Sequence, residues 1–316
     1  MQPIPPSRVL SVAAQQTESQ LVNWRVQRFR EALDRPLAIV AAGGTETAGA
    51  LWARFHERAG QPAWVTHPQD FISRPIPPGT AALILSTSGR HHDLLGAARH
   101  ALKSGVPTHV VVTAARSPLV ALVRDAGAEN ASFTLPTLGA DASRYDLHCT
   151  LPMSILAAHI YEGGGPWADC FEGDPIALPA GLPADVVTLG VGLARPVALD
   201  FAQKCRESGV APAHVSELRQ FAHGGVMAVR PEHTWLVCCA MGQDRGYLDR
   251  YLTQIPENVA VLRLETSGNG VRSALNLLAR SMMTFAALAD RAGQHPDRNR
   301  FPSWASKLRL LPLDQA

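Results

Sequence analysis

The chain has 316 residues, of which 46% are hydrophobic and 18% are charged, and its formal net charge is +2. This composition supplies enough apolar surface for sizeable cores and argues against disorder. The length exceeds a typical domain of about 100–200 residues, so two compact units are expected. The 29 basic residues are scattered singly, which argues against a nucleic-acid partner because phosphate-backbone binding needs a clustered basic stripe.

No segment has the pattern of a signal peptide or a membrane span. The first residues lack the apolar core of a signal peptide, and no run approaches about 18 uninterrupted apolar residues. We therefore expect a cytoplasmic protein without a membrane partner. The five cysteines form no CxxC pair, and Cys238-Cys239 lies in an apolar run typical of a buried strand. Reduced structural thiols and no metal site are expected.

The first half of the chain alternates short apolar runs with helical stretches. The spacing in residues 17–34 predicts an opening helix that Pro36 closes. The apolar run 37–41, a glycine-bearing turn and a helix over 50–60 then form a βα unit. The same rhythm continues with strand-like runs at 81–86, 108–113 and 131–136 and helices at 91–104 and 117–127. This alternation predicts a parallel sheet that is covered on both faces.

A Gly/Pro-rich stretch, residues 163–184, follows an apolar helix expected from Thr150 to Tyr161 and is interpreted as a linker. The second half then repeats the pattern, with strands expected at 185–192, 211–216, 233–241 and 258–265 and helices at 194–208, 245–255 and 271–292. The predicted fold class is α/β, with two tandem three-layer units, each a mostly parallel sheet flanked by helices. The expected divisions are a helical segment (1–35), a first domain (36–162), the linker, a second domain (185–293) and a surface tail (294–316).

The turns that follow strands are the places to search for ligand-binding residues, because open parallel sheets bind ligands beyond the carboxyl ends of their strands. Ser86-Thr87-Ser88-Gly89 follows one predicted strand and precedes a helix that starts near His91. Hydroxyl groups and backbone N–H groups at a helix N-terminus can bind an anion such as phosphate. A simple helix cap made by Ser86 or Ser88 is the alternative.

The first strand-to-helix turn contains Gly43-Gly44-Thr45-Glu46-Thr47. It lacks the GxGxxG spacing, so a nicotinamide or flavin cofactor is not expected. We expect no cofactor of any other kind. Gly44 and Thr45 could equally be plain turn and cap residues.

Two sites in the second half carry ionisable side chains. Lys204 and Glu207 are three residues apart on one helix face, where an exposed ion pair is the common outcome. His223 stands in the sequence Phe-Ala-His-Gly-Gly, and an imidazole with a pKa of about 6.5 suits acid–base chemistry. An incidental loop histidine is the alternative, because the chain contains twelve histidines.

Together these motifs resemble the sugar isomerase (SIS) domain family, and the second half is most similar to its isomerase domains, such as those of glucosamine-6-phosphate synthase and of phosphoglucose/phosphomannose isomerases. The sequence STSG at 86–89 resembles the family's Ser-x-Ser-Gly sugar-phosphate loop, and GGT at 43–45 resembles the Gly-Thr turn before it. ALDFAQKCRE and FAHG align without a gap to the family's helix with a catalytic Glu and to its later His-Gly. The interval of 16 residues from Glu207 to His223 is also the family's spacing.

The resemblance implies a role for each aligned residue. Glu207 would carry a proton between C1 and C2 of the sugar through an enediol, and His223 would open the sugar ring. Lys204 would orient Glu207, and Lys307 is similar to a sugar-contacting lysine in the family's C-terminal tail. In such enzymes the histidine loop can come from the partner subunit, which implies a homodimer.

The sequence also departs from the family pattern at the phosphate loop. Glu46 stands where the family usually has a phosphate-binding Ser, and its carboxylate would repel a phosphate unless it is neutralised. Arg90 and His91 replace the usual Glu-Thr after Ser-x-Ser-Gly, and they would supply compensating positive charge. The phosphate site is therefore altered.

The leading hypothesis is an aldose–ketose or amino-sugar isomerase that acts on a sugar phosphate or a related anionic sugar. A sugar-amine deglycase would use the same Glu207 and His223. A non-catalytic sugar-phosphate-binding or regulatory protein of the same family is the other alternative.

Overall fold

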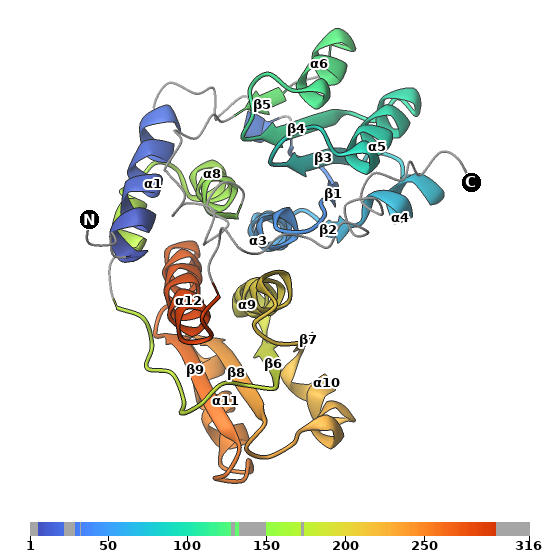
Figure 1. Cartoon of the computed structure of the whole chain (residues 1–316). Coiled ribbons are helices and arrows are strands. Elements are labelled where there is room, and N and C mark those ends of the chain that lie inside the picture. The colour runs from blue at the N-terminus through green and yellow to red at the C-terminus, as the bar shows by residue number, and fades with distance from the viewer. Residues whose placement is uncertain are drawn as a thin grey trace. The chain divides into compact units, whose positions relative to one another are not determined.

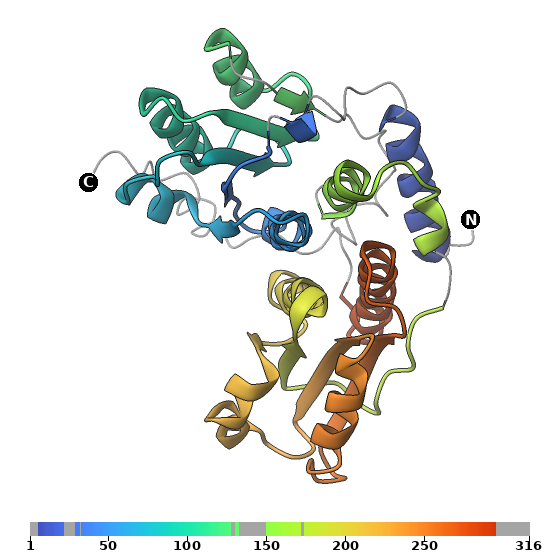
Figure 2. The same ribbon diagram turned by 180° about the vertical axis from the view of Figure 1, so that it is seen from behind.

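The computed structural model describes residues 6–21, 29–31, 33–127, 130–132, 150–171 and 174–294. The chain divides into two compact units, one built on a five-stranded sheet and the other on a four-stranded sheet. Figures 1 and 2 show the elements of both units from opposite sides.

The opening helix differs from the prediction. Helix α1 (Pro6–Leu21) begins well before residue 17, residues 29–31 are helical again, and the chain from Leu33 to Pro36 is not helical. The buried positions of α1 include Ala13, Ala14 and Thr17, whose hydroxyl donates to the Ala13 carbonyl oxygen at 2.8 Å. This buried face of α1 was not predicted, because small and hydroxyl-bearing residues give only a weak hydrophobic periodicity.

The first sheet is entirely parallel, with strand order β2-β1-β3-β4-β5. Its strands are β1 (Leu37–Val40), β2 (Ala63–Thr66), β3 (Ala81–Ser86), β4 (Thr108–Val112) and β5 (Asn130–Ser132). Strand β5 begins one residue before the predicted run 131–136, of which residues 133–136 lie outside the described residues. Strand β2 was not predicted, because it lies at the sheet edge and is only partly buried, with Trp64 37% exposed.

Helices cover both faces of this sheet. They are α3 (Thr45–Arg58), α4 (Pro68–Ser73), α5 (His92–Lys103), α6 (Pro118–Asp125) and α8 (Thr150–Glu162). Residues of α4, α5 and α6 pack against alternate strand residues such as Val40, Ile84 and Val110 on one face. On the other side α3 lies beside α8, and the Trp52 indole donates to the Met153 carbonyl oxygen at 2.9 Å (Figure 1).

The second sheet is also parallel, with strand order β7-β6-β8-β9. It contains β6 (Asp185–Gly190), β7 (Ala213–Ser216), β8 (Thr234–Met241) and β9 (Ala260–Thr266). The helices of this unit are α9 (Arg195–Ser208), α10 (Leu218–Ala222), α11 (Asp244–Leu252) and α12 (Val271–Arg291), with 3-10 turns η1 (Ala168–Phe171), η2 (Gly192–Ala194) and η3 (Gly225–Ala228).

Helices also pack on the strands of the second sheet. Residues of α10 and α11 pack on one face of it, with Leu189 and Leu236 in the core between them. Helices α9 and α12 lie together, as Figure 2 shows, with the rings of Phe201 and Phe285 edge to face. The predicted fold class of two α/β units with parallel sheets is confirmed.

Part of the segment 163–184 is attached to helix α12. The Arg272 guanidinium donates to the Pro166 carbonyl oxygen at 2.9 Å and lies over the Trp167 ring. Further along, the Ile176 N–H donates to the Thr284 hydroxyl at 3.0 Å. Residues 166, 167 and 176 of the predicted linker therefore pack against helix α12 of the second unit.

The cysteines of the described ranges are free and buried: Cys170, Cys205, Cys238 and Cys239. Burial raises the pKa of the Cys205 and Cys238 thiols to about 12, so both are neutral and unreactive near pH 7. Within the described ranges no cluster of His, Cys, Asp or Glu is arranged to hold a metal ion. No helix there is both long and apolar enough to cross a bilayer.

Candidate functional site

Two of the predicted ligand turns are neighbours at the carboxyl edge of the first sheet. The Gly43–Thr45 turn follows β1 and the Ser86–Gly89 turn follows β3, and these two strands pair directly in parallel register. The Thr45 hydroxyl donates to the Ala42 carbonyl oxygen at 3.0 Å and lies 3.4 Å from that of Leu85. Thr45 thus closes its own turn and contacts the end of β3.

The Ser86–Gly89 turn is held by its own hydroxyl groups. The buried Ser86 hydroxyl accepts from the Gly89 N–H at 3.0 Å, and the exposed Ser88 hydroxyl accepts from the Arg90 N–H at 3.3 Å. The Thr87 carbonyl oxygen accepts from the Thr113 hydroxyl at 2.8 Å. Because a serine hydroxyl both donates and accepts, these bonds leave the O–H of each serine as a donor toward a ligand.

Gly89 fits this turn only because it has no side chain. Its φ is +61°, and a Cβ atom there would lie 2.3 Å from the Ser117 hydroxyl oxygen. Ser117 cannot readily move, since it caps α6 by accepting from the Val120 N–H. The close approach of the turn to the N-cap of α6 therefore requires glycine.

We expect Gly89→Ala to lower the free energy of unfolding by about 1–2 kcal/mol more than Gly105→Ala does, because of overpacking. Gly105 has a φ of +69° and nothing within 4 Å of the Cβ position, so both variants share the left-handed backbone cost of about 1–2 kcal/mol. Urea unfolding of both variants measures the difference. Equal losses would show that Ser117 yields without cost.

A histidine and an arginine follow this turn directly. His91 occupies the N-cap position of α5 in extended conformation, and its Nδ1 atom lies 3.6 Å from the Asp93 carboxylate. The Arg90 side chain is exposed. An N-terminus of a helix as long as α5 attracts anions through its unpaired N–H groups. Asp93 therefore balances His91, while Arg90 faces solvent.

Glu46 has a partner that the sequence did not reveal. Its carboxylate lies in the first turn of α3, and the Nε2 atom of His67, just after β2, is 3.8 Å away. A protonated His67 would offset the negative charge that Glu46 brings near the phosphate turn. The neighbouring Gly44 carbonyl oxygen accepts from the buried Thr150 hydroxyl at 3.0 Å, which fixes the start of α8 on this turn.

In the second unit, Lys204 has an ionic partner one helical turn earlier on α9. Its ammonium donates to the Asp200 carboxylate at 2.7 Å, and both side chains are buried on α9. Glu207 follows one turn later and is exposed. A buried lysine needs an anionic partner inside the fold. Asp200 supplies it from one helical turn before the Lys204–Glu207 motif. The expected contact between Lys204 and Glu207 stays a prediction.

Glu207 and His223 lie toward opposite edges of the second sheet. Helix α9 starts beyond the carboxyl end of β6 and runs back to the amino edge, where the Arg206 guanidinium donates to the Ala213 carbonyl oxygen at the start of β7 at 3.1 Å. His223 follows α10, beyond the carboxyl end of β7. Strand β7 separates the two residues by at least about 10 Å along the sheet. Lys307, the remaining predicted residue, lies outside the described residues.

Comparison with solved structures identifies the fold. Glucosamine-6-phosphate deaminase from Thermotoga maritima is 15% identical, with a TM-score of 0.67 over 93% of this chain and 96% of that one. Tagatose-6-phosphate ketose/aldose isomerase from Escherichia coli is 16% identical, with a TM-score of 0.66 over 92% of each chain. The C-terminal domain of glucosamine-fructose-6-phosphate aminotransferase from Francisella tularensis is 15% identical, with a TM-score of 0.62 over 91% and 96%.

The chain has the tandem sugar-isomerase (SIS) fold. The matches span nearly the whole length of this chain and of those proteins, so both α/β units belong to the SIS architecture. No protein-family model matches the chain, and no curated protein matches it. At 15–16% identity the likeness establishes the SIS fold and leaves the chemistry to the residues of this chain.

Proposed function

We propose that this SIS protein is a sugar isomerase that acts in the cytoplasm on a small sugar phosphate or a related anionic sugar. The observation that carries the proposal is the pairing of the Gly43–Thr45 and Ser86–Gly89 turns at one sheet edge, next to the N-terminus of α5. Solved proteins of the same fold are named for reactions on glucosamine 6-phosphate and tagatose 6-phosphate. The substrate phosphate would accept hydrogen bonds from the Ser86 and Ser88 hydroxyls and from backbone N–H groups.

Glu207 and His223 supply the two proton-transfer groups that isomerisation needs. His223 would move the proton that opens the sugar ring. The Glu207 carboxylate would then remove the proton on C2, so that the C–H electron pair forms the C1=C2 bond while the C1=O π pair moves to O1, which takes up a proton to complete the enediol. In the second half the O2–H proton leaves as the C2=O bond forms, replacing the proton taken up at O1, and the C1=C2 pair takes the proton back from Glu207 onto C1. One carboxylate that alternates between base and acid completes the transfer without a cofactor.

The proposal includes a homodimer in which each site takes His223 from the partner subunit. Within one chain, Glu207 and His223 lie near opposite ends of β7. His223 is exposed, and the η3 turn directly after it exposes Val226 by 41% and Met227 by 87%. An exposed apolar pair beside a catalytic loop suits burial against a second subunit.

Replacing Ser88 with alanine is expected to reduce the rise in melting temperature that sugar phosphates cause, by weakening their binding about fivefold to tenfold. The loss of one hydrogen bond from an exposed hydroxyl costs about 1–1.5 kcal/mol, which gives this ratio. Differential scanning fluorimetry with hexose 6-phosphates and amino-sugar phosphates measures the shift.

Ser104→Ala is the matched control, because Ser104 is an exposed serine at the other end of α5. An undiminished shift in Ser88→Ala would reject this phosphate turn. Sugar-phosphate binding without any exchange of the C1 or C2 hydrogen in D2O would favour a binding or regulatory protein, and release of an amine would favour a deglycase.

A further inference from the structure

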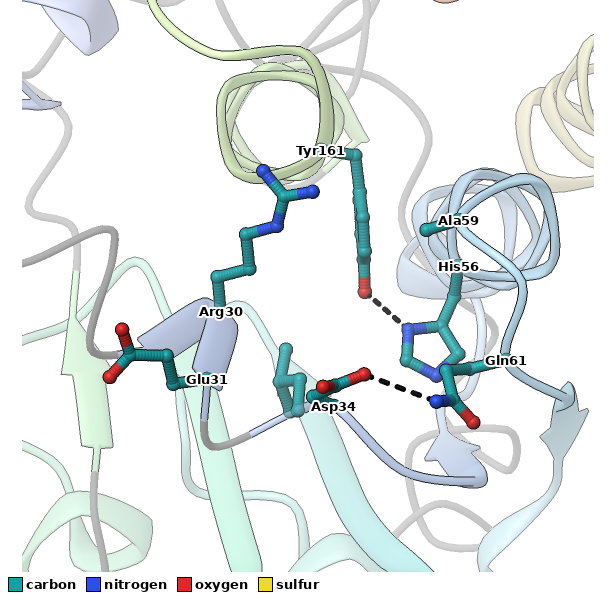
Figure 3. Close-up of a pocket in the computed structure, with 8 residues that line it drawn as sticks. Arg30, Glu31, Asp34, His56, Ala59, Gln61 and Tyr161 are labelled. Carbon is teal, nitrogen blue, oxygen red and sulfur yellow. Dashed lines mark hydrogen bonds between the residues drawn. The ribbon is translucent and has the colours of Figure 1, made fainter.

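A cavity lies at the opposite edge of the first sheet from the phosphate turns. It has a volume of about 220 Å³ and is lined in part by Asp34, just before β1, and Gln61, just before β2. His56 in the last turn of α3 and Tyr161 in the last turn of α8 complete its wall (Figure 3). Because the carboxyl ends of β1 and β2 point away from the cavity, it is separate from the phosphate turns of the same unit.

One wall of the cavity is fixed and neutral. The Nε2 atom of His56 lies 2.8 Å from the Arg35 carbonyl oxygen, which can only accept, so Nε2 carries the proton of the neutral ring. The Nδ1 atom then accepts from the Tyr161 hydroxyl at 2.7 Å. Burial lowers the pKa of His56 and raises the pKa of Tyr161. Both side chains are therefore uncharged near pH 7.

Opposite charges flank this wall. Figure 3 shows the Arg30 guanidinium beside the Tyr161 ring near α8, whereas the Asp34 carboxylate lies toward the hydroxyl end of the ring. Asp34 accepts from the Gln61 amide at 3.1 Å, which holds the carboxylate in place. The Glu31 carboxylate points away from the ring (Figure 3). The cavity thus offers a cation and an anion on different sides of one aromatic surface.

We propose that this cavity binds a small zwitterion of the α-amino-acid class, with its carboxylate on Arg30 and its ammonium group on Asp34. A water molecule takes about 30 Å³, so the space equals about seven waters, below the 300–1,000 Å³ of sites for drug-sized ligands. A phosphate dianion is disfavoured, because Asp34 and Glu31 would repel it. The ligand class therefore differs from the proposed sugar phosphate, and the inference does not depend on the isomerase reaction.

Isothermal titration of the full chain with individual common L-amino acids tests the proposal, with propionate and propylamine as ligands of one charge. At least one amino acid is expected to bind with a dissociation constant in the millimolar range or tighter, and each one-charge ligand at least about tenfold more weakly. Arg30→Gln and Asp34→Asn should each weaken the binding of that amino acid at least about tenfold, because each removes one charge contact.

Arg58→Gln and Asp70→Asn are the matched controls, since both side chains are exposed and outside the cavity. They should leave binding unchanged, and because Arg30 and Asp34 are exposed as well, all four variants should fold, as circular dichroism would verify. The absence of binding by every amino acid, or full binding by both Arg30→Gln and Asp34→Asn, would overturn the proposal. These results leave the Ser88 test of the isomerase site unaffected, so the two failures are distinguishable.

Discussion

The Glu207→Gln variant is expected to lose the exchange of the C1 or C2 hydrogen of its sugar substrate with D2O by about 10²–10⁴-fold, the usual contribution of a general acid–base group. The amide keeps the shape of the side chain but cannot accept and return the proton. Sugar binding should persist nearly unchanged, because the phosphate turns lie in the first unit. Proton NMR in D2O follows the exchange, and thermal shift follows the binding.

Glu257→Gln serves as the control for this variant. Glu257 is an exposed carboxylate in the same unit, after α11, so its replacement should leave the exchange rate unaltered. Exchange in Glu207→Gln at the rate of the unaltered protein would remove Glu207 from the mechanism.

A mixture of Glu207→Gln and His223→Asn chains distinguishes a site shared between subunits from a site within one chain. If His223 comes from the partner subunit, each mixed dimer has one site with both native residues and one with neither. Equal mixing then restores about one quarter of the activity, since half of the dimers are mixed. If both residues came from one chain, every site would lack one group and the mixture would stay inactive.

The fold was predictable from the sequence where strands are buried on both sides. Ala81–Ser86 and Thr234–Met241 are completely buried, and such strands appear as continuous apolar runs between glycine-bearing turns. The edge strand β2 was not predicted because Ala63–Thr66 is only partly buried and its apolar run, Ala-Trp-Val, is shorter than the run of about 4–8 residues typical of a buried strand. Helix α1 was not predicted because alanine and threonine occupy the middle of its buried face, between Leu10 and Leu21.

The sequence was sufficient to locate the turns of the candidate site, but it did not indicate the ionic partners of Glu46 and Lys204. Strand-to-helix turns can be located by glycine and serine, and parallel pairing of β1 and β3 brought two of them together. The contacts of Glu46 with His67 and of Lys204 with Asp200 were not anticipated. The Glu46–His67 contact joins residues of different elements, so it depends on tertiary structure. The Lys204–Asp200 contact depends on which face of α9 is buried. A single sequence indicates neither contact.

His109 is the titratable side chain for which burial has the largest expected consequence for stability. It lies on β4, is 5% exposed, and has no hydrogen-bond partner on either ring nitrogen within the described residues. Its ring packs edge to face against Phe29 at 5.5 Å. Burial, with a smaller contribution from the charge of Arg35, lowers the pKa of His109 from 6.5 to about 4.

This lowered pKa predicts acid destabilisation in a defined pH window. Below pH 6.5 the unfolded chain binds a proton at His109 that the folded chain rejects until about pH 4. The contribution is therefore fully present above pH 6.5 and is lost as the pH falls toward 4. At pH 4.5 the loss of unfolding free energy is about 2–3 kcal/mol, since each pKa unit corresponds to about 1.4 kcal/mol.

Between pH 7 and 4.5 the unfolding free energy of the His109→Leu variant should consequently fall by about 2–3 kcal/mol less than that of the unaltered protein, measured by urea unfolding at each pH. Burial lowers the pKa of His56 as well, so a shallower slope of the same sign should remain. His92→Leu, at an exposed position on α5, should keep the full dependence of unfolding free energy on pH.

The contradicting outcome is a pH dependence in His109→Leu equal to that of the unaltered protein. It would mean that the His109 imidazole of the unaltered protein gains a proton, and water to solvate it, without global unfolding. The five-stranded sheet would then open locally at β4 in mild acid to admit water, because neither ring nitrogen of His109 has a hydrogen-bond partner within the described residues.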